Sequence, residues 1–221
     1  IIMLTNFKTN LDDIKLKISD IGNGLLEANI LILSALTDCD PEKFSEAKAH
    51  ITNVGSKADE IDNAIIKVLA LYTPEARDLR QVIAYLKTTN ELSRACSNTR
   101  SFIRGFMGVC KEVDGVTITE YAVPMQTATV AAIRNTIGMI NCEDEDEIQE
   151  IYNDVLIEEN KVDDLYEMVE RKLSLQADDE KSFEKFHRML RALRKSGKIA
   201  SRSISMAHLL VYAKIGGNFR N

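Results

Sequence analysis

The sequence contains very few residues that break helices. Its 221 residues include only three prolines and ten glycines, and none is tryptophan. Long segments therefore contain nothing that would end a helix, and Leu, Ile, Ala, Glu and Lys all favour helical structure. With 45% apolar and 28% charged residues, the chain has enough material for a buried core and a solvated surface. The composition predicts an all-α protein and argues against disorder.

Motifs for zinc and thiol redox chemistry are absent. Cys39, Cys96, Cys110 and Cys142 are widely separated and form no CxxC pair, and the three histidines form no HExxH motif. These absences exclude the zinc-ribbon and thioredoxin-like classes. We expect reduced thiols with a mainly structural role.

Charge and the length of apolar runs bear on location and partners. The formal net charge is −6, and no basic face is evident, so the sequence does not predict a nucleic-acid-binding protein. The apolar runs are far shorter than the roughly 20 residues that span a bilayer, and the N-terminus does not have the pattern of a signal peptide. We expect a soluble cytoplasmic protein. The chain begins Ile1-Ile2-Met3, which leaves its true start open.

Residues that break helices, together with the spacing of apolar residues, divide the chain into six predicted helices. Thr73 and Pro74 are expected as N-cap and first residue of the third helix. Pro124 predicts a kink or a late start in the fourth, because proline lacks a backbone donor and clashes with the preceding turn. In the sixth helix, apolar residues spaced three and four apart from Phe183 to Val211 predict tight packing against a neighbour. The predicted ranges are 11–36, 42–71, 74–106, 117–140, 147–173 and 179–215.

The two halves of the sequence correspond to each other. Residues 60–62 match residues 161–163, and Leu92 matches Leu193 at the same offset of 101. A period this long, with three helices in each copy, indicates two tandem three-helix bundles, rather than a solenoid of short repeats. We predict bundles at residues 1–110 and 111–221.

One stretch of the sequence resembles the PhoU family. The run from Pro74 to Arg80, PEARDLR, is followed by Asn90-Glu91-Leu92 and Arg94, and this resembles the most recognisable segment of that family. Residues 21–27, IGNGLLE, similarly resemble the family's first helix. The resemblance implies a PhoU-like fold and a dimeric, non-enzymatic regulator in the cytoplasm.

The resemblance also implies a function and partners. A PhoU-type protein restrains phosphate uptake and phosphate-starvation signalling by engaging a phosphate ABC transporter and its membrane sensor histidine kinase. In this chain, the candidates for partner binding or for a structural role are Arg77, Asp78, Arg80, Glu91 and Arg94. No catalytic residues are expected.

Members of the family often bind metals through pairs of acidic residues four apart, which share one helix face. This chain departs from that pattern in its first half. Asp62 is retained, but Ala58 stands four residues before it, and Ser93 and Ser97 stand where the family has acidic residues. A hydroxyl is a poor substitute for an anionic ligand.

The second half retains the spacing but changes the facing residues. Glu159 and Asp163 are four apart, and the offset of 101 places Arg194 and Lys198 opposite them. We therefore expect internal ion pairs there and no bound cofactor, with a divalent or iron cation as the alternative at Asp62, Glu159 and Asp163. The acidic run 143–147 is expected to be a solvated turn and helix start.

Other function classes stay open. A di-metal carboxylate enzyme needs Glu-x-x-His motifs on facing helices, and the sequence does not supply that set. A helical adaptor of another membrane transporter, or a structural bundle unrelated to phosphate, remains the alternative to phosphate regulation.

Overall fold

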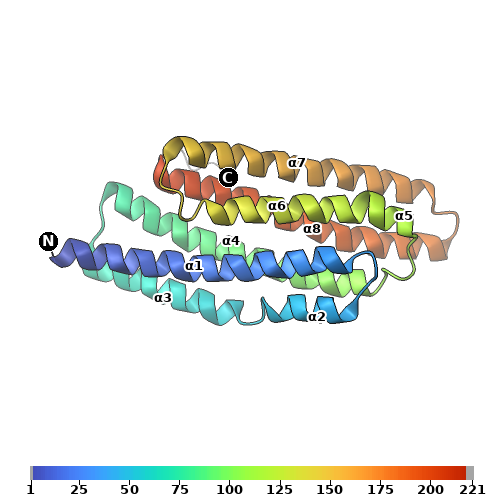
Figure 1. The fold of residues 1–221 in the computed structure, drawn as a ribbon, viewed down its shortest axis with the longest axis horizontal. Helices are drawn as coiled ribbons and strands as arrows, with labels where there is room; N and C mark the ends of the chain where they lie inside the picture. Colours follow the sequence, from blue (N-terminus) through green and yellow to red (C-terminus); the bar gives the residue numbers. More distant parts are fainter. Residues whose placement is uncertain (1, 218–221) are drawn as a thin grey trace.

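The described part of the protein consists of helices and the turns that join them (Figure 1). The structure, a computed structural model, describes residues 2–217, and within that range no strand occurs. The all-α prediction is confirmed. The elements are α1 (Ile2–Ala35), α2 (Pro41–Ala49), α3 (Val54–Tyr72), α4 (Ala76–Met107), α5 (Gly115–Thr117), the π-helix η1 (Ile118–Ala122), α6 (Val123–Gly138), α7 (Glu145–Leu175) and α8 (Glu180–Lys214).

The helices form two three-helix bundles that lie side by side (Figure 1). The first contains α1, α4 and the consecutive helices α2 and α3, and the second contains α6, α7 and α8. The tandem bundles predicted from the sequence are therefore confirmed. Buried residues of both bundles belong to one continuous core, and the division between residues 110 and 111 stays a prediction.

The most extensive contact between helices joins α4 to α8, one from each bundle. The two helices are antiparallel. Arg80, near the start of α4, lies over the ring of Tyr212, near the end of α8. Arg188, near the start of α8, donates a hydrogen bond to the carbonyl oxygen of Gly108, which follows α4. Two grooves along this helix pair contain the candidate sites described below.

Aspartate side chains start several of the helices. Asp40 accepts hydrogen bonds from the backbone N–H groups of Glu42 and Lys43 at the start of α2. Asp144 and Asp179 cap α7 and α8 in the same way. A carboxylate at this position satisfies free N–H groups and interacts favourably with the helix dipole. The predicted starts of the fifth and sixth helices lie within two residues of the observed ones.

The predicted second helix is divided into α2 and α3. A turn at residues 50–53 separates them, and in this turn the carbonyl oxygen of Ile51 accepts a hydrogen bond from Arg100 of α4. Ile51 itself is fully buried, so the break lets the chain bend around α1 while the apolar stripe continues. The prediction of one unbroken helix over 42–71 is wrong, because the spacing of apolar residues does not register a short turn that preserves the stripe.

The third helix begins later than predicted. Thr73 has a left-handed backbone (φ 44°) and ends α3, and Glu75 occupies the N-cap position of α4. Ala76 is also left-handed, with φ of 45°. Two left-handed residues on either side of Pro74 form the turn between α3 and α4, so Thr73 and Pro74 are not the cap and first residue of the helix. The first helix, by contrast, begins nine residues earlier than predicted, at Ile2.

Pro124 lies just after a π-helical segment, as the prediction of a kink anticipated. Residues Ile118–Ala122 form η1, and α6 continues from Val123 to Gly138 with Pro124 in its first turn. Proline removes one backbone donor and clashes with the carbonyl four residues before it, and a wider π turn relieves that clash.

A disulfide joins Cys39, in the turn after α1, to Cys110, in the turn after α4, with Cα atoms 6.0 Å apart. This separation is typical of a disulfide. The prediction of reduced thiols is therefore wrong for this pair, because the two turns are brought together only by the packing of α1 on α4. Cys96 and Cys142 are free and buried. Burial raises the pKa of the Cys96 thiol to about 12, so this group stays protonated.

A chain of buried polar side chains crosses the interior where the two bundles meet. Gln126 of α6 donates to the side-chain oxygen of Asn29 of α1 at 2.9 Å and accepts from Ser196 of α8 at 3.2 Å. Asn29 also donates to Thr99 of α4, and Ser196 lies 2.9 Å from the hydroxyl of Thr129. Satisfied networks of this kind fix one arrangement of helices, because any other leaves buried polar groups unpaired.

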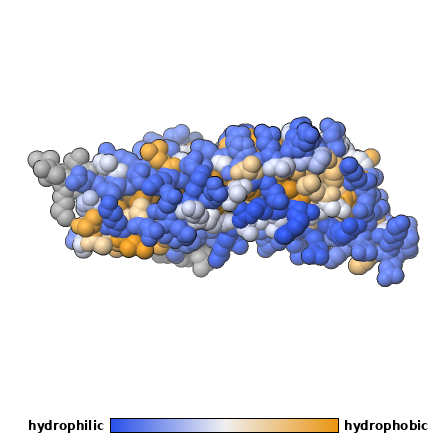
Figure 2. Space-filling view, turned by 90° about the horizontal axis from the view of Figure 1, so that it is seen from below, coloured by the Kyte–Doolittle hydropathy of each residue, from blue (hydrophilic) through white to orange (hydrophobic). Residues whose placement is uncertain are grey.

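The surface shown in Figure 2 is mostly hydrophilic, interrupted by hydrophobic areas. Large apolar side chains that remain exposed include Leu16, Ile66, Leu175 and Phe183. Phe183 was predicted to continue the apolar stripe of the last helix, but it stacks on His187 at the surface. Among residues 2–217, none of the helices combines the length and apolar character that a membrane span requires.

Gly24 allows α1 to pack directly against the turn between α2 and α3. A Cβ atom there would lie 2.6 Å from the backbone oxygen of His50. We expect Gly24→Ala to lower the free energy of unfolding by about 1 to 3 kcal/mol, as overpacking does. Gly55→Ala is the matched control, because its Cβ would meet nothing within 4 Å, so helix propensity should raise stability by about 0.5 to 1 kcal/mol. Urea unfolding measures both, and equal stabilities would contradict the contact.

Candidate functional site

The first turns of α4 present two of the predicted residues to solvent. Arg77 and Asp78 are exposed, and Asp78 lies in the first turn, where its charge interacts favourably with the helix dipole. Neither side chain belongs to an ion pair within the described part of the chain. They are therefore free to contact another molecule.

Arg80 has a different setting from its two neighbours. Its guanidinium lies 5.9 Å from the ring centroid of Tyr212, and its Nε atom is buried without a hydrogen-bond partner. Gly216, which has φ of +90°, comes so close that a Cβ atom on it would lie 2.8 Å from the Arg80 guanidinium. Arg80 thus joins the start of α4 to the end of α8, and we expect its role to be structural.

Glu91 and Arg94 lie together in a groove between α4 and α8. Arg202 of α8 donates to Glu91 at 2.9 Å, and Arg94 lies 3.6 Å from the same carboxylate. The cavity at this point has a volume of about 620 Å³, which lies within the range of roughly 300 to 1,000 Å³ that is usual for small-ligand sites. We call it the Glu91 groove; its lining includes Lys87, Asn90, Glu91, Arg94, Tyr152, Arg202, Ser205 and His208.

The Glu91 groove is suited to polar recognition. Glu91 is largely shielded, with 16% of its side chain exposed, whereas 64% of Arg94 is exposed. The carboxylate therefore holds Arg202 in place, while Arg94 directs positive charge outward. Such an arrangement can bind an acidic group of another molecule. Sequence reasoning found Glu91 and Arg94 but missed Arg202, because only the antiparallel packing of α4 on α8 brings it near.

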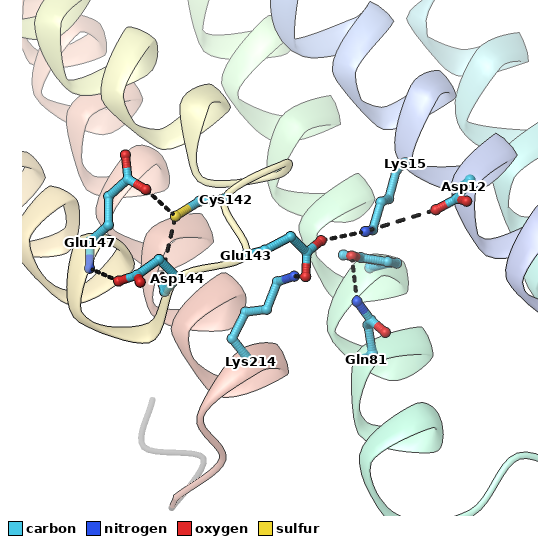
Figure 3. A network of polar contacts seen from close by, with 9 residues as sticks. Asp12, Lys15, Gln81, Cys142, Glu143, Asp144, Glu147 and Lys214 are labelled. Carbon is cyan, nitrogen blue, oxygen red and sulfur yellow. Dashed lines mark hydrogen bonds and ion pairs between the residues drawn. The ribbon is translucent and has the colours of Figure 1, made fainter.

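A second polar cluster ties the two bundles together at one end of the molecule (Figure 3). Glu143, in the turn before α7, accepts hydrogen bonds from Lys214 at 2.5 Å and from Lys15 at 3.1 Å. The side chain of Lys214 is only 5% exposed. Part of the acidic run 143–147 is a helix start, as predicted, with Asp144 as its cap. Glu143, however, is a bridge between α1 and α8, and sequence reasoning did not anticipate this.

This bridge should make stability depend on pH. The hydrogen bond from Lys214, followed by the contribution of Lys15, holds the pKa of Glu143 below its ordinary value. A lowered pKa stabilises the fold above the unfolded-state value, and this stabilisation is lost as the pH falls through the folded-state value. We expect Glu143→Gln to lose about 0.5 to 1 kcal/mol at pH 7, a small effect because water screens the exposed carboxylate.

The difference in the free energy of unfolding between Glu143→Gln and the unmodified protein should shrink as the pH falls below about 4.5. Urea unfolding at pH 7, 5 and 3.5 measures it, and comparison with the variant cancels the titration of other carboxylates. A difference that stays constant across this range would contradict the bridge.

Comparison with known proteins finds a match within the first bundle. Residues 18–102 match the sequence model of the PhoU domain. This segment of the chain is similar to a PhoU domain. The resemblance to the PhoU family predicted from the sequence is thereby confirmed, and the matched segment includes Arg77, Asp78, Arg80, Glu91 and Arg94. No curated protein sequence matches the chain.

Solved structures extend the likeness from the PhoU domain to the whole fold. PhoU from Pseudomonas aeruginosa is similar with a TM-score of 0.83 and 19% identity, over 96% of this chain and all of that one. The phosphate transport system regulatory protein PhoU from Streptococcus pneumoniae gives a TM-score of 0.78 and 16% identity, over 97% and 100%. The second bundle therefore shares the PhoU fold beyond the matched domain.

The acidic residue retained in the PhoU domain has a poor setting for a metal. One oxygen of Asp62 is buried without a hydrogen-bond partner, and the hydroxyl of Ser93 is in the same condition. Desolvation, with a contribution from Asp59, raises the pKa of Asp62. A single carboxylate does not provide the charge that a hard or transition-metal cation requires.

The acidic pair of the second bundle is not neutralised as predicted. Glu159 accepts a hydrogen bond from Ser201 at 3.2 Å, and Arg194 lies over the ring of Tyr166, 5.4 Å from its centroid. Among the ion pairs of residues 2–217, none joins Glu159 or Asp163 to Arg194 or Lys198. The predicted ion pairs are not formed, because the register of α8 places Ser201 opposite Glu159. Burial and the charge of Asp163 raise the pKa of Glu159.

These residues do not fit a metal cluster. Within the described range, no group of three or more His, Cys, Asp and Glu side chains is arranged to hold a metal ion. The single Glu-x-x-His spacing, Glu184 to His187, does not alter this, since His187 stacks on Phe183.

We expect the purified protein to contain no stoichiometric multinuclear iron or zinc. Elemental analysis after dialysis measures this. A tightly bound transition metal that is lost in the double variant Glu159→Ala with Asp163→Ala would contradict the expectation. Weak binding at the exposed acidic run 143–147 would not, because it shapes no site.

Proposed function

We propose that this protein is a cytoplasmic negative regulator of phosphate uptake and phosphate-starvation signalling. It acts by binding a phosphate ABC transporter and its sensor histidine kinase, as a homodimer and without catalysis. It reaches the membrane only through these partners. The observation that carries the proposal is the PhoU domain at residues 18–102, set in a fold that resembles a phosphate transport regulatory protein along almost its whole length.

The arrangement of the candidate residues supports a binding role. Arg77 and Asp78 are exposed at the start of α4, and Arg94 projects charge from the Glu91 groove. The groove brings together arginines, a carboxylate and amide or hydroxyl groups, which are the side chains that recognise charged surfaces. Nucleic acid is not an expected partner of a chain with a net charge of −6.

The experiment is a deletion strain carrying a reporter for phosphate-responsive transcription. We expect loss of the protein to raise reporter expression when phosphate is abundant, and the intact gene to restore repression. The double variant Arg77→Glu with Asp78→Lys should restore it poorly and should recover less transporter and kinase in a pull-down. Changing rim charges alters the rate of association, and like charges placed opposite each other disfavour a complex.

Lys67→Glu is the matched control, because Lys67 is exposed on α3 of the same bundle and lies outside the proposed surface. It should restore repression fully. Unchanged reporter expression in the deletion strain would contradict phosphate regulation. Recovery of a different transporter in the pull-down would instead identify an adaptor of that system.

A further inference from the structure

A basic cleft lies between the end of α4 and the start of α8. Its volume is 400 Å³, and its charged lining consists of Arg104, Arg188, Arg191 and Lys195. Gly105 and Ala192 pack closely at this point, since a Cβ atom on Gly105 would lie 3.3 Å from that of Ala192. Four cations thus surround a space bounded by small residues, in a chain whose net charge is −6.

The basic cleft is the duplicate of the Glu91 groove. The offset of 101 that relates the two halves converts Lys87, Glu91 and Arg94 into Arg188, Ala192 and Lys195. The same offset relates Arg202 of the groove to Ser101, which also lines the cleft. The positive charges of Lys87 and Arg94 are therefore kept in the basic cleft, as Arg188 and Lys195.

The difference between the two sites is the carboxylate. In the Glu91 groove, Glu91 pairs with both Arg202 and Arg94. In the basic cleft, Ala192 occupies the equivalent position, so no acidic side chain lines the space. The cleft therefore has the charge of an anion site, whereas the groove is partly neutralised from within.

Three of the four cations are available to a ligand. Arg188 is engaged, because it pairs with Glu112 at 2.6 Å and donates to the carbonyl of Gly108. For Arg104, Arg191 and Lys195, no ion pair or hydrogen bond of the side chain is found within residues 2–217. Clustered like charges repel one another, and a bound anion would relieve that repulsion.

The size and limits of the cleft indicate what kind of anion fits. The uniformly positive region is compact, because beyond Arg188 the carboxylates of Glu112, Asp179 and Glu184 alternate with Lys181 and Lys185. An extended acidic segment of another protein would run into these carboxylates. A compact, highly charged anion avoids them, and arginine recognises phosphate oxygens through paired hydrogen bonds.

We propose that the basic cleft binds a small anion that carries at least two phosphate groups. Arg104 of α4 faces one side of the ligand, and Arg191 and Lys195 of α8 face the other. The volume of 400 Å³ lies within the range of small-molecule sites. This proposal concerns a ligand and does not rest on the protein partners proposed above.

Isothermal titration calorimetry with inorganic tripolyphosphate tests the proposal. We expect one site per chain with a dissociation constant below about 1 mM, and orthophosphate and sulfate at least tenfold weaker. Arg191→Ala with Lys195→Ala should weaken tripolyphosphate binding by roughly tenfold for each hydrogen bond to phosphate that is lost. The swap Arg191→Lys with Lys195→Arg keeps the charge and should retain most of the binding.

The matched control removes two positive side chains from the Glu91 groove, as Lys87→Ala with Arg94→Ala, of which Arg94 is the equivalent of Lys195. It should change the dissociation constant by less than about threefold. Circular dichroism and the melting temperature confirm that each variant is folded. Equal weakening by both double variants would show nonspecific counterion binding and overturn the proposal, as would the absence of saturable binding. Tighter binding of a hexaglutamate peptide than of tripolyphosphate would overturn it in favour of an acidic protein segment.

Discussion

Replacing Gln126 with leucine should lower the free energy of unfolding by about 2 to 4 kcal/mol. Gln126 is 1% exposed and donates to both oxygens of Asn29, the backbone carbonyl and the side-chain oxygen. Leucine would leave these buried acceptors without their donor, and each unsatisfied buried group costs about 1 to 3 kcal/mol. Urea unfolding followed by circular dichroism measures the loss.

Two controls test whether the buried network itself is responsible. Thr127→Ala alters an exposed residue of the same helix, whose hydroxyl bonds only to the carbonyl of Val123, and it should change stability by less than about 0.5 kcal/mol. The double variant Asn29→Leu with Gln126→Leu should lose less than the sum of the single losses, because removing both partners leaves fewer unpaired groups. Additive losses would contradict a direct interaction.

Breaking the bond between Cys39 and Cys110 should also have a large effect. The disulfide closes a sequence separation of 71 residues, for which the loss of unfolded-state entropy corresponds to about 4 kcal/mol. Cys39→Ser with Cys110→Ser should therefore lower the stability of the oxidised protein by about 2 to 4 kcal/mol. Thermal unfolding with and without dithiothreitol measures it.

The reductant supplies the control for this second experiment. Dithiothreitol should bring the unmodified protein to the stability of the double variant and should leave the double variant unchanged. A titration of the denatured, unreduced protein that finds four free thiols, rather than the two of Cys96 and Cys142, would contradict the disulfide. In a reducing compartment the bond is not maintained, so this stabilisation belongs to the oxidised protein.

The sequence predicts the fold well where the apolar pattern is long and regular. Helices α7 and α8 begin at aspartate caps and carry unbroken stripes, and both were predicted to within two residues at each end. The break between α2 and α3 was missed because Ile51 keeps the stripe intact while a long-range hydrogen bond from Arg100 supports the turn. Contacts of that kind depend on packing that a sequence pattern does not contain.

The candidate site shows the same division. Glu91 and Arg94 were found because both belong to one local motif, but Arg202 lies more than a hundred residues away in sequence. The internal repeat could not reveal Arg202 either. The repeat relates equivalent positions of the two halves, whereas the antiparallel packing of α4 on α8 brings positions together that are not equivalent. The predicted ion pairs at Glu159 failed because the register of α8 against α7 places Ser201 opposite Glu159.

The pairing of α4 with α8 has a consequence for the newly made chain. Helix α4 is complete at Met107, but its partner ends only at Lys214. At the usual pace of translation, roughly 5 to 20 residues per second, several seconds pass before the ribosome has delivered α8. During that interval the side of α4 that will meet α8 has no cover, and the nascent first bundle must avoid association through it until the last helix emerges.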